Sequence, residues 1–228
     1  MVEESANESN KSAWDRLYRA TSNPVWGEEP LAFLESVIEP LGTNLGAGRT
    51  FLDAATGEGR NLPFFIDAGN EIYACDASAG ALSKLAQRFG NRIKTTQCDL
   101  SQTPYPNASF DLILMADVIE TLPEAAQVLE EMARVLRPGG KLLCNIPDDT
   151  EEIAGEDMVG LGSHTYLYQN NYYYRFYSRE QAIGLLEKAG MEVIYAEEHT
   201  WSEAPHPEFR SYAHDHRSLV LISRKPMA

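Results

Sequence analysis

A short stretch of small residues at 51–60 (FLDAATGEGR) constrains the fold of this chain more than any other segment. Phe51 and Leu52 close an apolar strand that ends at Asp53, and a helical pattern opens at Arg60. Glycines between a strand and a helix let a ligand approach bare backbone, and the first N–H groups of the helix are free to meet negative charge. The stretch therefore predicts a strand–turn–helix unit with a ligand site at the turn.

The spacing of the small residues separates this turn from the dinucleotide-binding fingerprint. The pattern G-x-G-x-x-G would require glycines that Ala55 and Asn61 or Leu62 do not supply. The turn instead resembles the first motif of class I S-adenosylmethionine-dependent methyltransferases, usually D/E-x-G-x-G-x-G, which reads here Asp53-x-Ala55-x-Gly57-x-Gly59. Ala55 replaces the first glycine, and the resemblance places its methyl group near the methionine part of the cofactor.

Two further acidic residues end predicted strands after the turn. Strand 71–75 closes on Asp76, and a carboxylate at this place in a βαβ unit can accept hydrogen bonds from both ribose hydroxyls. The stretch 76–89 that follows resembles the family pattern through Asp76, Ser78, Leu82 and Ala86. Strand 92–98 ends at Asp99, which the resemblance assigns to the adenine amino group, with the backbone of Leu100 at a ring nitrogen. The alternative is that Asp99 only caps a turn with Ser101.

The resemblance continues through the middle of the chain. The nearly continuous apolar run 110–116 predicts a strand buried on both faces. The element 117–124 (DVIETLPE) resembles the family's D-V-L-E-H-L-P, with Thr121 where many relatives carry a histidine that can act as a base. A helix over 125–136 then passes through the typical turn 137–140 (RPGG) into strand 141–146. No N-P-P-Y or D-P-P-Y tetrapeptide follows run 110–116, which counts against flipped bases and glutamine amides as acceptors.

Over about residues 50–225 the chain is thus similar to the class I methyltransferases. The resemblance implies one domain over 1–228 with an α/β, Rossmann-like seven-stranded sheet: six parallel strands, the last strand antiparallel, helices on both faces and an N-terminal helical layer. It implies S-adenosyl-L-methionine as cofactor. Residues 57–61 with Trp14 and Trp26 are similar to the tellurite-resistance and thiopurine methyltransferase branch. The residues expected to hold the cofactor are Trp26, Asp53, Ala55, Thr56, Gly57, Gly59, Arg60, Asp76, Ala77, Asp99, Leu100 and Met115.

The N-terminal segment 1–45 is expected to form a helical lid. Residues 12–20 carry Trp14 and Tyr18 at helical spacing, and 31–41 reads as an amphipathic helix, whereas the first ten residues are polar and expected to fray. Trp26 lies in the loop between these helices, and loops carry function more readily than helix faces, so a role in the site is expected for it. Trp14 and Tyr18 fit a lid and simple packing on the flank of the domain equally well.

An aromatic-rich insertion at 148–177 departs from a bare Rossmann-like core. Six tyrosines and one phenylalanine lie within 166–177, and Ser178 with Gln181 predicts a capping box that starts a helix over 179–189. The insertion leaves the sheet at the carboxyl end of a strand, where open α/β sheets bind ligands. It can wall an acceptor pocket or offer ring faces to the sulfonium charge. A dimer interface or an ordinary lid core remains the alternative.

The link between two predicted C-terminal strands, 192–196 and 218–223, gathers four of the five histidines of the chain. The fold places this link at the cofactor end of the sheet. One reading is an acceptor-binding wall with His206 or His214 as general base and Arg210 as an anion clamp. A second is a metal site, although no family pattern demands a metal and none is expected; its ligands would be His206, Glu208, His214 and His216. A third is a structural loop whose imidazoles bond backbone carbonyls.

Charge and cysteine content limit the partners of the chain. With 19 basic and 34 acidic residues the formal net charge is −15, which disfavours nucleic acid and anionic membrane surfaces as partners. The three cysteines have no C-x-x-C spacing and lie in or beside apolar strand patterns, which indicates reduced thiols. No leader or membrane-spanning run is recognised, so a cytoplasmic protein is expected.

These observations predict direct transfer of a methyl group to a small-molecule acceptor. A sulfur, selenium or tellurium acceptor needs no enzyme base, whereas oxygen, nitrogen or carbon would require one, for which His206 and His214 are the candidates. The alternatives are a non-catalytic protein that binds S-adenosylmethionine, a methyltransferase acting on a macromolecule, and a nicotinamide-dependent oxidoreductase, against which Asp53 argues. The sequence does not specify the acceptor or the oligomeric state.

Overall fold

A computed structural model describes residues 2–42, 48–66, 69–147, 151, 158–169 and 171–227, with side chains from residue 8 onwards. Parts of three predictions lie outside these ranges: the end of the N-terminal lid at 43–45, the end of the helix expected over 61–68, and positions 148–150, 152–157 and 170 of the insertion.

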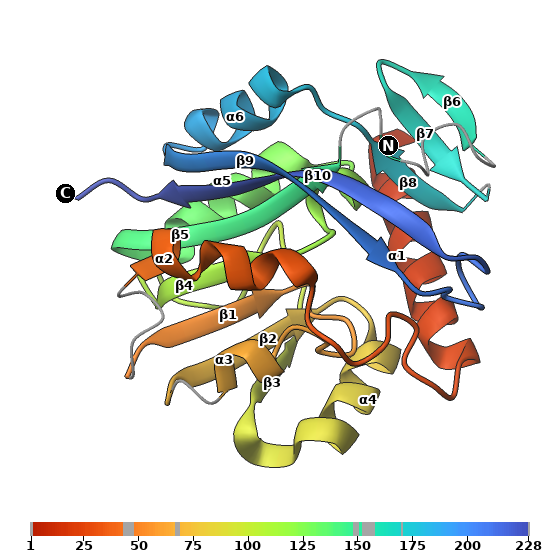
Figure 1. Cartoon of the computed structure of the whole chain (residues 1–228), viewed down its shortest axis with the longest axis horizontal. Helices are drawn as coiled ribbons and strands as arrows, with labels where there is room; N and C mark the ends of the chain where they lie inside the picture. Colours follow the sequence, from red (N-terminus) through yellow and green to blue (C-terminus); the bar gives the residue numbers. More distant parts are fainter. Residues whose placement is uncertain are drawn as a thin grey trace.

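A seven-stranded sheet forms the centre of the molecule (Figure 1). The strand order is β3-β2-β1-β4-β5-β10-β9, and β10 pairs antiparallel with both of its neighbours while the other pairs are parallel. This confirms the predicted sheet of six parallel strands and a last antiparallel one. The strands are β1 Thr50–Ala54, β2 Glu71–Asp76, β3 Lys94–Gln97, β4 Phe110–Met115, β5 Leu136–Pro147, β9 Glu192–Glu203 and β10 His214–Arg224.

Helices cover both faces of this sheet because the central strands are apolar on both sides. Every residue of β4 is buried, as its uninterrupted apolar run predicts. One face packs against α5 (Ala125–Val135) and α6 (Arg179–Lys188) through residues such as Val128 and Leu186. The other face packs against α4 (Ala79–Phe89), α3 (Pro63–Ile66), α2 (Ile38–Leu41) and the 3-10 helix η1 (Ala32–Val37). Two further short 3-10 turns are η3 Gly90–Arg92 and η4 Ile119–Thr121.

Three helices differ from the sequence predictions in length or type. The first helix, α1, begins at Val2 and ends at Ala20, so the polar residues expected to fray belong to it. Segment 31–41 is divided into η1 and α2 rather than forming one amphipathic helix. The described part of the helix expected after the small-residue turn is only the four residues of α3, which begins at Pro63, a residue suited to the first turn.

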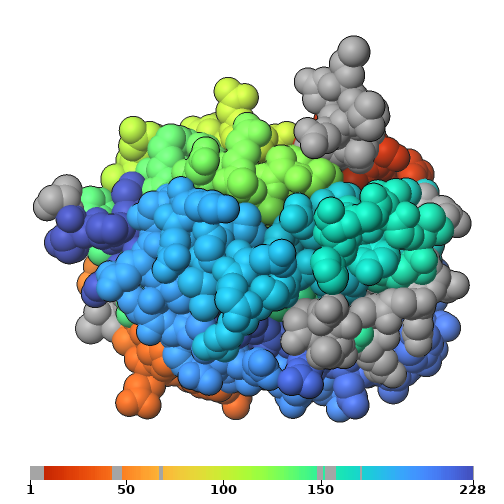
Figure 2. All heavy atoms as spheres, turned by 90° about the horizontal axis from the view of Figure 1, so that it is seen from above, coloured from red at the N-terminus to blue at the C-terminus, as the bar shows by residue number. Residues whose placement is uncertain are grey.

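The insertion folds into a small antiparallel sheet of its own, which the sequence did not predict. Its strands are β6 Met158–Gly162, β7 Thr165–Tyr168 and β8 Tyr172–Arg175. Alternate residues of β8, Tyr172 and Tyr174, are buried in an aromatic cluster with Tyr18 of α1 and with Phe209. The small sheet therefore packs on α1, beside which it lies in both views of the molecule (Figures 1 and 2).

The β9–β10 hairpin is longer than predicted. Strand β9 extends to Glu203, so His199 and Trp201 lie in a strand and not in the link. Pairing continues to the tip, where Glu203 lies opposite His214 and Trp201 opposite His216. The free end of this hairpin reaches α1, whereas the C-terminus lies at the opposite side of the sheet (Figure 1). Among the described residues no helix has the length and apolar character to cross a bilayer.

Candidate active site

A cleft is lined by residues at the carboxyl ends of β1, β2, β4 and β5, by residues of α1 and by residues at the tip of the β9–β10 hairpin. Its open space, including the part continuous with solvent, is about 1630 Å³. Ten of the twelve residues predicted to hold the cofactor line it: Trp26, Asp53, Ala55, Thr56, Gly57, Arg60, Asp76, Ala77, Asp99 and Leu100.

The other two predicted residues lie behind the cleft lining. Met115 is fully buried in the core beneath the sheet edge. A Cβ at Gly59 would come within 2.7 Å of Leu62 and 2.9 Å of Phe89, so this glycine allows the turn to pack closely on α4. Gly59 therefore influences the shape of the turn through its packing against Leu62 and Phe89 and does not line the cleft.

The turn after β1 presents bare backbone to the cleft. A Cβ at Gly57 would approach the hydroxyl oxygen of Tyr18 to 2.8 Å, and the residue has a φ of +54°. Ala55, which replaces the first glycine of the motif, also adopts a left-handed conformation with φ 57°. A residue with a Cβ is strained in this region, by roughly 1–2 kcal/mol. The chain thus retains the backbone path of a glycine-rich turn at a position where it carries alanine.

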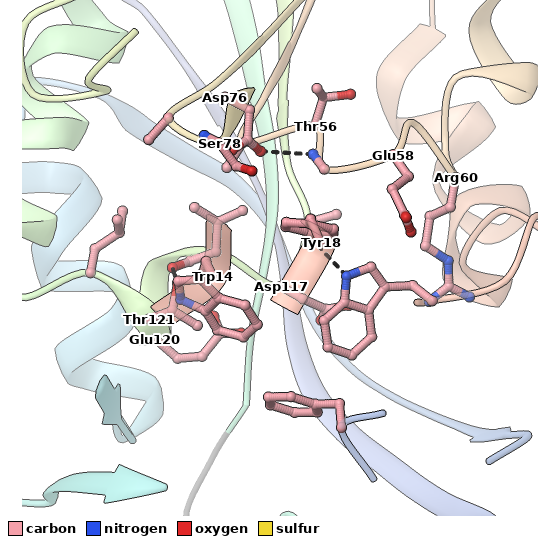
Figure 3. A pocket seen from close by; sticks show the side chains of 18 of the residues that line it. Trp14, Tyr18, Thr56, Glu58, Arg60, Asp76, Ser78, Asp117, Glu120 and Thr121 are labelled. Atoms are coloured by element: carbon pink, nitrogen blue, oxygen red, sulfur yellow. Dashed lines mark hydrogen bonds between the residues drawn. The ribbon is translucent and has the colours of Figure 1, made fainter. Parts of the chain in front are cut away.

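Two buried carboxylates stand at the ends of adjacent strands below this turn. Asp76 accepts hydrogen bonds from the backbone N–H groups of Gly57 and Ser78, each at 2.8 Å (Figure 3). Burial raises the pKa of Asp76, while these N–H groups act in the opposite direction. Asp53 accepts a hydrogen bond from Thr56 Oγ1 at 2.7 Å, and burial raises its pKa to about 7. The floor of the cleft is therefore rich in hydrogen-bond acceptors.

Asp99 has partners that the sequence suggested only in part. Its Oδ1 accepts hydrogen bonds from the backbone N–H and the hydroxyl of Ser101, as in the turn considered above. Its Oδ2 lies 2.5 Å from Nζ of Lys11, and Lys11 was not predicted as a site residue. This ion pair joins α1 to the end of β3 at the edge of the cleft.

An aromatic wall closes one side of the cleft. Trp26 donates a hydrogen bond from Nε1 to the hydroxyl of Tyr18 at 2.9 Å (Figure 3), and its ring lies 5.0 Å from Phe209. Trp14 stacks on Phe209 with ring centroids 5.5 Å apart and packs against Tyr172 at 4.5 Å. The N-terminal helix, the loop after it, the insertion and the C-terminal link thus contribute to one wall. Trp14 and Tyr18, for which the sequence left two readings open, both line the cleft.

Charged residues of the turn hold the covering segments in place. The carboxylate of Glu58 accepts a hydrogen bond from the backbone N–H of Val25 at 2.6 Å and pairs with Lys84 at 2.6 Å. Asn61 accepts a bond from the N–H of Leu31 at 3.0 Å. Arg60 pairs with Glu203 at the end of β9 at 3.0 Å. The turn that borders the cleft therefore also fixes the N-terminal layer and the C-terminal hairpin.

His206 of the C-terminal link and His214, the first residue of β10, line the cleft with their rings 5.3 Å apart. His206 Nε2 lies 2.8 Å from Oε2 of Glu203. Burial, with help from the nearby Arg210, lowers the pKa of His214 to about 4. Burial alone would also lower the pKa of His216, but the carboxylates of Glu151 at 3.0 Å, Glu203 and Asp117 together outweigh it and raise this pKa to about 10.

Sequence reasoning missed several carboxylates of this region. Glu203 was read as part of a loop, and Asp117 and Glu120 were quoted only as part of a motif. Glu120 is buried, and its Oε2 has no hydrogen-bond partner among the described residues. Burial, reinforced by the nearby Asp117, raises the pKa of Glu120 well above its usual range. Glu208, considered above as a metal ligand, is exposed and does not line the cleft.

Comparison with known proteins shows that the chain is similar to methyltransferases. Residues 52–144 match the family model of a methyltransferase domain. A probable S-adenosylmethionine-dependent methyltransferase of Mycolicibacterium smegmatis is 32% identical over 147 residues, which cover 64% of this chain and 53% of that protein. A demethylmenaquinone methyltransferase of Paenarthrobacter aurescens is 35% identical over 96 residues, 42% of this chain and 38% of that protein. The chain spans about half or less of the length of these curated relatives.

Solved structures share the fold over nearly the whole chain. A 1,6-didemethyltoxoflavin-N1-methyltransferase of Burkholderia thailandensis, solved with S-adenosylhomocysteine, superposes with a TM-score of 0.68, covers 96% of this chain and 88% of its own, and is 22% identical. The cyclase SpnF superposes with a TM-score of 0.60 at 18% identity over 86% of this chain and 80% of its own. Because one fold carries methyl transfer in one protein and cyclisation in another, the reaction has to be argued from the site.

Proposed function

We propose that this chain, a member of the class I S-adenosylmethionine-dependent methyltransferases, transfers a methyl group from S-adenosylmethionine to a small-molecule acceptor. The observation that carries the proposal is the convergence of the motif residues. Asp53 and Gly57 of the first motif, Asp76 and Asp99 come from three separate segments of the sequence, yet all line one cleft. Asp76 is moreover bonded directly to the backbone of Gly57.

The residues at the cleft floor fit the proposed cofactor. An ionised carboxylate offers about four lone-pair sites, and backbone N–H groups use two of those of Asp76, so the remaining ones are available to ribose hydroxyls. Gly57 has no side chain, so the cofactor can approach its backbone closely. A larger residue would not fit at this position, because its Cβ would collide with the hydroxyl of Tyr18. Asp53 lies at the end of β1, where a neighbouring cationic group would favour its ionised form. Asp99 and Leu100 line the cleft, and in this proposal they would face the adenine ring.

The cofactor supplies an electrophilic methyl group on a positively charged sulfur. The contribution of the chain is to hold the acceptor in line with that group and to exclude water. The aromatic wall of Trp14, Trp26 and Phe209 is suited to this, because it covers the cleft from segments of both chain ends. Ring faces in this wall also attract a sulfonium charge.

The acceptor side of the cleft is proposed to lie at the C-terminal link. His206 with Glu203 at 2.8 Å forms a pair in which the carboxylate stabilises the imidazolium that results when His206 takes a proton. His214 is a second candidate base, and Arg210, which also lines the cleft, is suited to hold an anionic acceptor group. An acceptor in the tellurite-resistance and thiopurine branch would present sulfur, selenium or tellurium and would not need this base.

A small molecule is favoured over a macromolecule for three reasons. Residues of α1, the loop with Trp26 and the C-terminal link line the cleft from several sides, which favours an acceptor small enough to fit between them. The net charge of −15 also disfavours nucleic acid. Two of the similar proteins, the demethylmenaquinone and didemethyltoxoflavin methyltransferases, have names that specify small-molecule acceptors.

Turnover assays distinguish the candidate functions. The chain is incubated with S-adenosylmethionine and pools of thiols, phenols, amines and chalcogen anions, and the release of S-adenosylhomocysteine and the mass of methylated products are measured. We expect at least one pool to give product in the wild type and none in Asp76→Asn. Binding of the cofactor without turnover on any pool would favour a regulatory protein, and methylation of RNA or protein alone would contradict a small-molecule acceptor. A thermal shift with NAD but not with S-adenosylhomocysteine would contradict the methyltransferase proposal itself.

A further inference from the structure

Three side chains near the tip of the β9–β10 hairpin turn their ligand atoms towards one another. Glu203 is the last residue of β9, His214 is the first of β10, and His206 lies in the link between them. One carboxylate oxygen and one ring nitrogen of each histidine all lie within 4.8 Å of one another. The strand register sets Glu203 directly opposite His214, and paired backbone bonds with Arg210 fix the position of His206. Backbone pairing thus sets the relative positions of the three residues.

Surrounding groups orient the ligand atoms. His214 Nδ1 lies 3.0 Å from the carbonyl oxygen of Tyr212. Because a carbonyl oxygen can only accept, Nδ1 carries the hydrogen and Nε2 keeps its lone pair, the arrangement by which outer partners prepare a histidine for a metal. Oε1 of Glu203 accepts a hydrogen bond from Nε1 of Trp201 at 3.2 Å and pairs with Arg60 at 3.0 Å. Oε2 faces His206 at 2.8 Å, and it also accepts a longer hydrogen bond from Nη1 of Arg60 at 3.3 Å and lies 3.7 Å from Nε2 of His216.

The spacing and chemistry of the cluster suit a metal ion. Ligand bonds of about 2.0–2.2 Å to nitrogen and oxygen place tetrahedral ligands roughly 3.3 Å apart. This value lies between the 2.8 Å that separates His206 from Glu203 and the 4.8 Å within which all three ligand atoms lie. Small side-chain movements would therefore allow the three residues to coordinate an ion. His206 and His214 are 7% and 5% exposed, which protects the bonds from solvent.

We propose that Glu203, His206 and His214 bind a divalent transition-metal ion such as Zn²⁺. Two imidazoles and one carboxylate form a ligand set that leaves at least one coordination position open. All three residues line the cleft, so the open position faces the proposed acceptor site. The carboxylate ligand is therefore Glu203 and not Glu208, which the sequence analysis had considered.

The ion would also change how an acceptor is activated. A thiol or hydroxyl group bound at the open position would lose its proton more readily, because the positive charge stabilises the anion. His206 would then serve as a ligand, and general-base catalysis would not be needed. This consequence rests on the proposed function, whereas binding of the ion does not.

The test measures metal binding directly. The full chain is treated with EDTA, dialysed and titrated with Zn²⁺ by calorimetry, and with Co²⁺ while its visible absorption is recorded. We expect one equivalent of each ion to bind, with the intense visible bands of a tetrahedral or five-coordinate Co²⁺ site. Glu203→Gln and His214→Ala should each weaken binding at least about tenfold, since each removes a ligand.

Two matched variants control for the chemistry of the change. Glu208→Gln alters an exposed carboxylate two to six residues from the ligands, and His199→Ala removes a histidine of β9 that is hydrogen-bonded to Tyr195, outside the cluster. Both should bind Zn²⁺ as the wild type does. Thermal unfolding in the presence of EDTA shows which of the two ligand variants keeps the wild-type fold without metal. One folded ligand variant is enough for the comparison of Zn²⁺ affinity. Absence of saturable binding by the wild type, or equal affinity in a folded ligand variant, would overturn the proposal. Binding of S-adenosylhomocysteine, measured separately, reports on the proposed function.

Discussion

Replacing Gly57 by alanine should damage the cleft through one identifiable contact. The added Cβ would lie 2.8 Å from the hydroxyl oxygen of Tyr18, which is buried and accepts the hydrogen bond of Trp26. The left-handed backbone adds strain of about 1–2 kcal/mol. Displacing the Tyr18 ring in a packed wall costs about 1–3 kcal/mol more, and weakening its hydrogen bond about 1 kcal/mol. We therefore expect Gly57→Ala to lower the free energy of unfolding by about 3–6 kcal/mol.

Gly90→Ala separates the contact from the backbone strain. Gly90 has a φ of +58°, close to the +54° of Gly57, but a Cβ there would meet no atom within 4 Å. This control should lose only about 1 kcal/mol, because the stiffer unfolded chain offsets part of the strain.

A double-mutant cycle with Tyr18→Phe isolates the clash. Without the hydroxyl the nearest atom of the ring is Cζ at 3.4 Å, an ordinary contact, so the double variant Tyr18→Phe/Gly57→Ala should be more stable than the sum of the single changes predicts. We expect a favourable coupling of about 1–3 kcal/mol, measured by denaturant unfolding of all four proteins. Additive effects, or equal losses in Gly57→Ala and Gly90→Ala, would refute the inferred packing of α1 on the turn.

Three further changes test the floor and cover of the cleft. The pKa of Asp53 is about 7 in the folded protein and about 4 in the unfolded chain, so between these pH values only the folded protein keeps the proton. The free energy of unfolding should therefore fall as the pH rises through this interval, by about 1.4 kcal/mol per pH unit relative to Asp53→Asn. Parallel pH profiles of the two proteins would contradict this. Ala55→Gly should raise the unfolding free energy by up to about 1 kcal/mol, because it relieves the strain at φ 57°, and a clear loss in thermal unfolding would count against that strain. Trp26→Phe removes the hydrogen bond to Tyr18 and should weaken calorimetric binding of S-adenosylhomocysteine several-fold, with Trp201→Phe, whose ring does not line the cleft, as the comparison.

The parts of the fold that the sequence predicted are those whose signal is local. Strand β4 is buried on both faces, and its apolar run specifies this without reference to any partner. The capping box of Ser178 and Gln181 starts α6 as expected, because both of its hydrogen bonds lie within one turn. The strand-end positions of Asp53 and Asp76 follow equally from the motif and the length of β1 and β2.

The parts that it missed depend on pairing between distant segments. Tyr172 and Tyr174 alternate along β8, but whether they face a partner chain, a ligand or α1 is decided by the three-stranded sheet that β6 and β7 complete. Glu203 enters the site only because β9 continues past the predicted end of its strand and pairs with His214. Lys11 meets Asp99 because α1 crosses the end of β3, and no spacing in the sequence records that contact.

A crystal structure of the chain with S-adenosylhomocysteine tests the central claim most directly. The account predicts the ribose hydroxyls at hydrogen-bond distance from Asp76, the adenine beside Asp99, and the sulfur directed towards the side of the cleft that carries His206. A ligand bound away from the Gly57 turn, or a ribose without contact to Asp76, would contradict it.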